Sequence, residues 1–159
     1  MRSLALLAAL ACLSLGAVLS AGEDAAVKPA SPGVSFRAVD VWVDSGEKSL
    51  AAYQVEVGYD AKRVEIVGVE GGEPAGFREA PHFDEAGRTG GRIVLAAFVP
   101  ADSQAVKGAQ RVARLHLQVK GAAAPELSVK LVTTAQPGGE RIKAGAGLKV
   151  PAVEGEQGK

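Results

Sequence analysis

Hydrophobic and polar residues alternate with a period of two along much of the chain. In the segment AAYQVEVGYD, residues 51–60, Tyr53, Val55 and Val57 share one face, and polar or small residues share the other. Residues 112–120 alternate in the same way, with alanine, leucine and valine on one face. Because side chains of a β-strand point alternately to opposite sides, this pattern predicts strands with one buried face.

The segment before these strands changes phase. Alternate residues from Val39 to Val43 are valines and share one face. Phe36 and Ala38 stand in the opposite phase. This change predicts a bulge, or a strand that passes from one sheet to the other.

Further apolar segments of strand length occupy residues 64–70, 126–132 and 147–150. Residues 92–100 are apolar on both faces, as in a central or doubly covered strand. After the strand over 51–60, Asp60 is expected to accept hydrogen bonds from backbone N–H groups one and two residues later. No segment has the pattern of a long amphipathic helix. About seven or eight short strands joined by glycine-rich turns predict an all-β sandwich.

The first residues have the layout of a secretory signal peptide. Arg2 is followed by an apolar run and then by small residues. We predict a signal peptide over residues 1–21, cleaved after Ser20 or Ala21. The run is also close to the ~20 residues that a membrane span needs, so a permanent anchor is the alternative. Cleavage would leave an exported protein that is extracellular, periplasmic or in the cell envelope, with no membrane segment.

The other domain limits follow from composition. Residues 22–33 are acidic and small with two prolines, which indicates a linker. One folded domain is predicted over residues 34–150, followed by a disordered tail over residues 151–159. The only cysteine, Cys12, lies in the signal segment. The processed chain is therefore expected to hold no disulfide, thiol nucleophile or cysteine-bound metal.

Charge and aromatic content narrow the classes of partner. The 159 residues carry a formal net charge of +0, and aromatic residues make up only 4%. A neutral chain without a basic stripe provides no field for nucleic acid or an anionic membrane surface. We therefore expect neither of these partners.

The sequence offers little for catalysis. Its 2 histidines are His82 and His116, and no serine stands in a nucleophile-elbow motif. The acids Asp40, Asp44 and Glu47 are not spaced as in a calcium-binding loop. We therefore predict no catalytic residue, no metal and no cofactor.

Trp42 is the best candidate for contact with a sugar, because it stands out of phase with Val41 and Val43. Sites that bind sugars on a sandwich face usually stack several aromatic rings, and Trp42 has no aromatic partner on its own strand. Burial against the opposite sheet or a loop is the alternative for this side chain.

An ordered set of segments resembles the cohesin family. These segments are AAYQVEVGYDAKRVEIVGVEGG, HFDEAGRTGGRIVLAAFVPADSQAVKG and RVARLHLQVKG, followed by ELSVKLV. Cohesin-like domains have an alternating strand that ends in Tyr-Asp, then an apolar strand, a loop with Phe-Asp and two further strands. Here the match runs in this order from about Val39 to Val132.

The resemblance implies a jelly-roll β-sandwich of about eight or nine strands, related to some carbohydrate-binding modules. It also implies a non-catalytic module that binds a dockerin-type protein and assists extracellular polysaccharide breakdown. The implied binding surface is one sheet face that includes the strands over 51–60, 92–99 and 112–120. Carried over residue by residue, its outward side chains are Gln54, Glu56, Val94, Ala96, Phe98, Arg114, His116 and Gln118.

Three functions therefore remain open from the sequence. The first is an exported module that docks a protein partner through this face. The second is a carbohydrate-binding module that contacts polysaccharide through Trp42. The third is a structural envelope protein with no ligand.

Overall fold

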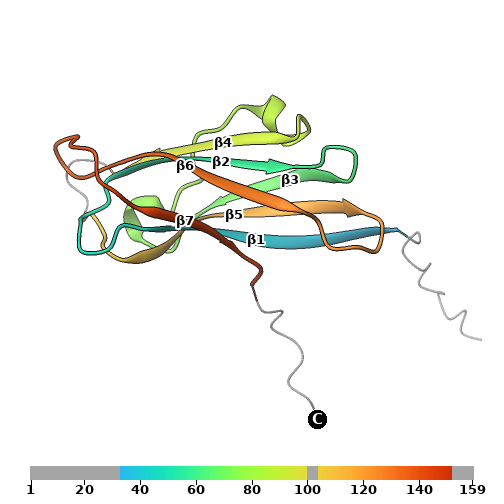
Figure 1. Cartoon of the computed structure of the whole chain (residues 1–159), viewed down its shortest axis with the longest axis horizontal. Helices are drawn as coiled ribbons and strands as arrows, with labels where there is room; N and C mark the ends of the chain where they lie inside the picture. Colours follow the sequence, from blue (N-terminus) through green and yellow to red (C-terminus); the bar gives the residue numbers. More distant parts are fainter. Residues whose placement is uncertain (1–32, 100–103, 152–159) are drawn as a thin grey trace, which may run out of the picture.

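The computed structural model describes residues 33–99 and 104–151, and all structural statements refer to these residues. The predicted signal peptide, the linker up to residue 32 and the tail from residue 152 lie outside them. Seven strands and two short 3-10 turns make up the described part (Figure 1). They are β1 (Val34–Asp44), β2 (Ala52–Tyr59), β3 (Val64–Gly71), η1 (Ala75–Phe77), η2 (Glu85–Arg88), β4 (Arg92–Phe98), β5 (Ala109–Lys120), β6 (Leu127–Ala135) and β7 (Gly145–Lys149).

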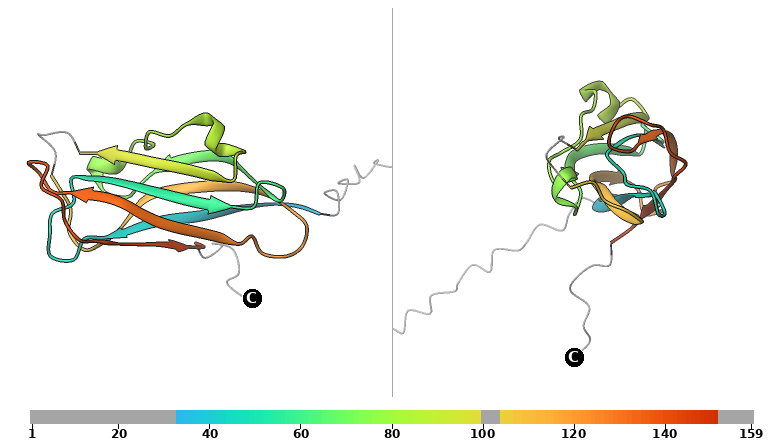
Figure 2. Two further views of the ribbon diagram at one scale, coloured as in Figure 1. Left: turned by 45° about the horizontal axis from the view of Figure 1, so that its top comes forward. Right: turned by 90° about the vertical axis from the view of Figure 1, so that its left-hand side faces the viewer.

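The strands form two antiparallel sheets, packed as the two layers of a sandwich (Figure 2). One sheet has the order β3-β5-β1-β7, and the other has the order β4-β2-β6. The predicted all-β sandwich is confirmed, with seven described strands in place of about eight or nine. Leu50 and His82 make single bridges to Val106 and Ala96 and extend no further, so they add no strand.

The core lies between the sheets and is made largely of valine and leucine. The predicted inward face of β2 is confirmed, because Tyr53, Val55 and Val57 are all buried. The Tyr53 hydroxyl donates a 3.0 Å hydrogen bond to the Val112 carbonyl, so its one polar atom has a partner. Phe77 meets the Tyr53 ring edge-on, with the ring centres 5.3 Å apart. The inward-facing residues of the alternating strands thus pack together in one core.

β1 remains in one sheet along its whole length, so the predicted passage between sheets is wrong. Its register with β5 shifts between Val41 and Trp42, because Val112 is an extra residue on β5 at that point. The predicted irregularity therefore exists, but later in the strand than Ala38. Phe36 is 71% exposed on the outer side of the sheet, which explains its phase without any crossing.

The turn after β2 is confirmed, with one of the two expected hydrogen bonds to the Asp60 side chain. The Asp60 carboxylate accepts a 2.9 Å hydrogen bond from the Lys62 N–H. The Asp60 carbonyl also accepts a 2.8 Å bond from the Val64 N–H, and Val64 re-enters the core. This turn therefore closes locally, without a ligand.

The connection between β3 and β4 folds back over the end of β3. Phe77, in η1, is buried in the core and anchors this connection. The Gly72 N–H donates a 2.6 Å hydrogen bond to the Phe77 carbonyl. Gly71 has no room for a side chain, because a Cβ there would overlap the Arg78 carbonyl oxygen. The paired glycines of this segment thus serve the close approach of two backbone segments.

No helix in residues 33–99 and 104–151 is long and apolar enough to cross a membrane.

Candidate functional site

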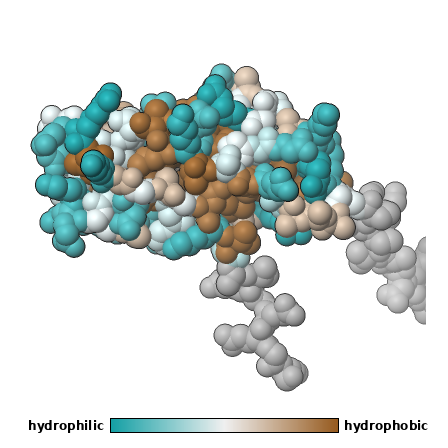
Figure 3. Space-filling model, in the orientation of Figure 1, coloured by the Kyte–Doolittle hydropathy of each residue, from teal (hydrophilic) through white to brown (hydrophobic). Residues whose placement is uncertain are grey.

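The sandwich presents two outer sheet faces. We call the outer side of β4-β2-β6 the three-strand face and the outer side of β3-β5-β1-β7 the four-strand face. In the orientation of Figure 1, apolar side chains also gather in the middle of the molecule, where β6 and β7 lie in front of the core (Figure 3). Leu131, Ile142 and Leu148 are partly buried and pack against the core, so folding explains them.

The residues expected on one binding face are divided between the two faces. Strands β2 and β4 are in one sheet, whereas β5 pairs with β1 and β3 in the other. The expectation of a single face is therefore wrong, because alternation along a strand does not specify its neighbours. The three-strand face holds Gln54, Glu56, Val94, Ala96 and Phe98, and the four-strand face holds Arg114, His116 and Gln118.

The register of β2 with β4 brings the predicted residues of the three-strand face together. Gln54 lies opposite Ala96, and Glu56 lies opposite Val94. Glu56 accepts a 2.8 Å hydrogen bond from Arg92 at the end of β4. β4 is last in the order of its sheet, so the expectation of a doubly covered strand is wrong and its outer side meets solvent.

Strand β6 completes the three-strand face. Lys130 lies opposite Glu56 in the register, and both Lys130 and Val132 are exposed, Val132 by 46%. Sequence reasoning placed β5 here and missed β6. The alternation of the segment ELSVKLV gives its outward residues, but does not show that β6 pairs with β2.

Phe98 is the most exposed large apolar side chain of this face, at 65%. Its ring stacks with the His82 ring, with centres 6.4 Å apart and planes 15° apart. Backbone hydrogen bonds of 2.8 and 3.0 Å between His82 and Ala96 hold the two segments in this arrangement. His82, which sequence reasoning did not place in the binding face, is therefore part of the face.

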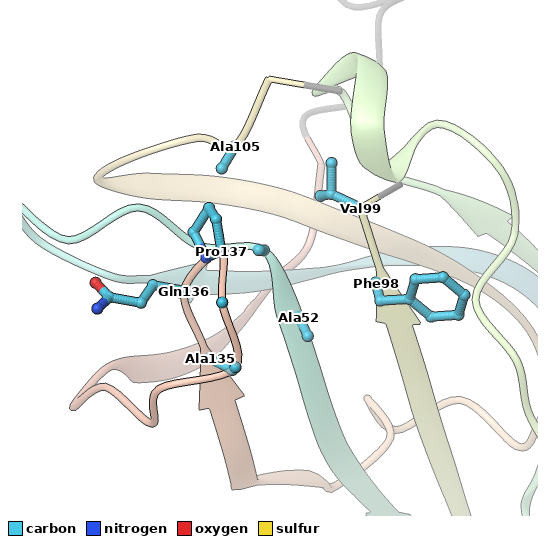
Figure 4. A pocket seen from close by; sticks show the side chains of 10 residues that line it. Ala52, Phe98, Val99, Ala105, Ala135, Gln136 and Pro137 are labelled. Atoms are coloured by element: carbon cyan, nitrogen blue, oxygen red, sulfur yellow. The ribbon is translucent and has the colours of Figure 1, made fainter. Parts of the chain in front are cut away.

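Two hollows flank Phe98. One, of about 540 Å³, lies where β2, β4 and β6 meet the loop around Pro137 (Figure 4). The other, of about 350 Å³, lies between Phe98 and the η1 segment and includes Glu79 and His82. The sheet face is therefore not flat around Phe98, because the exposed ring stands between two hollows.

The four-strand face has a different character, because its polar groups pair with one another. Arg114 donates hydrogen bonds of 2.7 and 3.2 Å to the two carboxylate oxygens of Asp40. This bonding raises the pKa of Arg114 above its ordinary value. His116 Nε2 lies 2.9 Å from Glu70 Oε1, within ion-pair distance but without hydrogen-bond alignment.

The same pairing extends across the four-strand face. Arg111 donates to Glu73 at 3.1 Å and to the Gly71 carbonyl at 3.1 Å. The Lys149 ammonium lies 4.0 Å from the centre of the Trp42 ring. For Trp42 the alternative to sugar contact was burial against the opposite sheet or a loop. Burial against the opposite sheet is wrong, because Trp42 lies on the outer face, where it is half-buried. Lys149 covers one side of the ring on which a sugar would stack.

No group of three or more histidine, cysteine or acidic side chains in residues 33–99 and 104–151 is placed to hold a metal ion. Asp40 is paired with Arg114, and Asp44 accepts a hydrogen bond from the Gly46 N–H. Asp40 and Asp44 are therefore used within the fold, whereas Glu47 is exposed.

Comparison with solved structures shows what this architecture resembles. A type I cohesin–dockerin complex of Clostridium thermocellum, formed by Coh-OlpA and Doc918, matches with a TM-score of 0.56 and 15% identity. The match covers 72% of this chain and 84% of that one. The sixth cohesin of scaffoldin B from Acetivibrio cellulolyticus, in complex with a mutant Cel5 dockerin, matches with a TM-score of 0.55 and 18% identity over 74% and 89% of the two chains. This chain folds as a cohesin-like domain.

A further match is the Coh-OlpC–Doc435 complex of Clostridium thermocellum, with a TM-score of 0.52 and 14% identity over 74% of this chain and 85% of that one. No protein-family model and no curated protein matches the sequence. The expected resemblance to cohesins is confirmed in the fold. In the cohesin-like sandwich described here, the residues around Phe98 form one outer face, and the residues around Arg114 form the opposite face, where Arg114 and Arg111 are bound to acidic partners.

Proposed function

We propose that this cohesin-like domain is a non-catalytic module that binds a protein partner through its three-strand face. The observation that supports this most directly is the exposed Phe98 ring, which lies between two hollows. Phe98 and Val132 are exposed on the three-strand face. The four-strand face also has an exposed ring, Phe36, but at its centre Arg114 is paired with Asp40. Polar groups that are already paired within a fold contribute little binding free energy to a partner. Exposed apolar groups contribute more, because a partner removes them from water.

The three-strand face has the composition of a protein interface. Val94, Ala96 and Phe98 lie along the edge strand β4 as an apolar row. Gln54 and the Glu56–Arg92 pair lie beside this row, on the central strand β2 and at the end of β4, and are polar. Interfaces that dock with little change of backbone commonly combine apolar contacts with flanking polar groups.

The class of partner follows from the resemblance. The matched solved structures are cohesin–dockerin complexes, so a dockerin-like module is the first partner to test. The signal-like residues 1–21 support export, and export together with the cohesin-like fold supports a role in extracellular polysaccharide breakdown. Lys149 over the Trp42 ring gives no support to sugar binding at that position.

The binding face is tested with a matched pair of variants. Val94→Lys places a charge in the apolar row of β4 on the three-strand face. Gln118→Lys places the same charge at a half-buried, outward position of β5 on the four-strand face. The chain and both variants are used as bait for crosslinking pull-down from secreted and envelope fractions, and against a panel of purified dockerin modules.

We expect partners retained by the unaltered chain and by Gln118→Lys to be lost with Val94→Lys. Equal retention by both variants would contradict the use of this face. Export is tested separately, by fractionation and by determining the N-terminus of the secreted chain. A chain found only in the cytoplasm with Met1 intact would contradict export.

A further inference from the structure

We propose that Phe98 separates two receiving sites of different chemistry, one for a large apolar side chain and one for a lysine or arginine of the same partner segment. This inference rests on the proposed function and specifies the partner of the three-strand face. Phe98 lines both hollows, and its ring is held by stacking on His82. One aromatic side chain thus forms a wall shared by both sites.

The larger hollow is suited to an apolar side chain. Its walls include Ala52 of β2, Ala135 of β6 and Val99, which follows β4. Pro137 lies on the facing loop (Figure 4). Gln136 is the one side chain with hydrogen-bonding groups among its described lining residues. A volume of about 540 Å³ can accept a leucine or an aromatic ring, and transfer of such a side chain from water is favourable.

The smaller hollow is suited to a cation. Glu79 and the exposed aromatic residues Phe98 and His82 are among its lining residues, as is Phe77, which is buried. Glu79 is exposed and forms no ion pair with any described residue. Arg78 precedes it in the chain but is not among the lining residues. A carboxylate beside exposed aromatic rings favours lysine or arginine through charge pairing and cation–π contact.

The two hollows share Phe98 as a lining residue, which favours a polypeptide over a small ligand. Both adjoin Phe98, and Phe98 continues the apolar row of Val94 and Ala96 along β4. A segment docked along this row therefore places side chains on both sides of the Phe98 ring. Because the apolar and acidic sites differ, the order of the two partner side chains also sets the direction of the segment.

The experiment selects peptides from a phage library of randomised 16-residue sequences on the immobilised full chain. We expect enriched peptides to combine a large apolar residue with a lysine or arginine at a fixed spacing. Phe98→Ala is expected to abolish their binding. Glu79→Gln is expected to weaken it about tenfold, since a charge-assisted contact is lost.

Matched controls separate this effect from general loss of charge or folding. Glu47→Gln removes an exposed acid in the turn between β1 and β2, and is expected to leave binding unchanged. Ala135→Leu narrows the larger hollow, and is expected to weaken peptides with a large apolar residue more than peptides with alanine in its place. Thermal melting of each variant reports whether it is folded.

The outcomes distinguish this inference from the proposed function. Peptides that lose binding with Val94→Lys but bind Phe98→Ala and Glu79→Gln normally would overturn the two-site arrangement while supporting the face. Peptides indifferent to Val94→Lys would contradict the proposed function itself. Selection of peptides without basic residues, or failure to enrich any, would also overturn the inference.

Discussion

Asp40 and Arg114 form a two-point salt bridge across the centre of the four-stranded sheet. They are directly paired in the register of β1 and β5, and their hydrogen bonds measure 2.7 and 3.2 Å. Asp40 is only 6% exposed, so Arg114 supplies the charge that compensates a buried carboxylate. The pair occupies an outer sheet position that would otherwise be open to a partner.

Removal of Arg114 should destabilise the fold. Arg114→Met leaves the Asp40 carboxylate buried without its partner, and we expect a loss of about 2 kcal/mol or more in the free energy of unfolding. Urea unfolding followed by circular dichroism measures this change. Arg92→Met breaks the exposed pair with Glu56 and is expected to cost less than about 1 kcal/mol. Equal costs for the two variants would show that Asp40 does not depend on Arg114.

Stability should fall at alkaline pH because of Tyr53. Burial raises the pKa of Tyr53 above its ordinary value of 10.0, since the phenolate would lose its hydration. The folded chain therefore keeps this proton at pH values where the unfolded chain releases it. The stability from neutral Tyr53 is complete below pH ~10 and is lost as the pH rises above it.

Absorbance at 295 nm during a pH titration measures this difference. The chain has 2 tyrosines, Tyr53 and Tyr59, and Tyr53 is the buried one. We expect Tyr53 to ionise only when the chain unfolds. Its share of the rise in absorbance at 295 nm should therefore occur at the same pH as the loss of the circular dichroism signal. Tyr53→Phe should remove that share and cost about 1 kcal/mol at neutral pH through the lost bond to Val112. Full ionisation of both tyrosines in the folded chain would contradict this assignment.

Truncation of Phe77 should test the anchor of the connection between β3 and β4. Phe77 is 2% exposed and packs on Tyr53, so Phe77→Ala should cost about 3 kcal/mol or more. Phe36→Ala is the matched control, because Phe36 is 71% exposed and its loss should change stability by less than about 0.5 kcal/mol. Thermal and urea unfolding compare the two, and a small effect at Phe77 would place this segment outside the core.

Gly71 should not tolerate a side chain. A Cβ at this position would overlap the Arg78 carbonyl oxygen, so Gly71→Ala must displace the backbone next to Glu79. We expect a lower melting temperature and weaker binding of any ligand that contacts the smaller hollow. Gly147→Ala is the matched strand control, since a Cβ there meets nothing within 4 Å. If both variants melt as the unaltered chain does, the close approach is not required.

Much of the fold could be predicted locally. The alternation through Tyr53, Val55 and Val57 correctly gave the inward face of β2, and Asp60 closes the predicted turn. These features depend on side-chain direction within one strand and on hydrogen bonds over two to four residues, which a sequence pattern records directly. The resemblance to cohesins likewise followed from the order of such segments.

The candidate site could be predicted only in part. Gln54, Glu56 and Phe98 were correctly grouped, because β2 and β4 share a sheet. Arg114 was wrongly added to them, because its outward direction on β5 is the same whichever sheet β5 joins. His82 was missed, since its place beside Phe98 depends on a bridge to Ala96 that no local pattern encodes.

The sequence by itself determined that the chain forms short strands with one apolar side, and which side chains share each side. Only the tertiary structure decided that β5 lies in the sheet opposite β2, that Arg114 is bound to Asp40, and that two hollows flank Phe98. The physical reason is that alternation fixes the direction of a side chain within its strand. Pairing between strands depends instead on contacts between residues far apart in the chain.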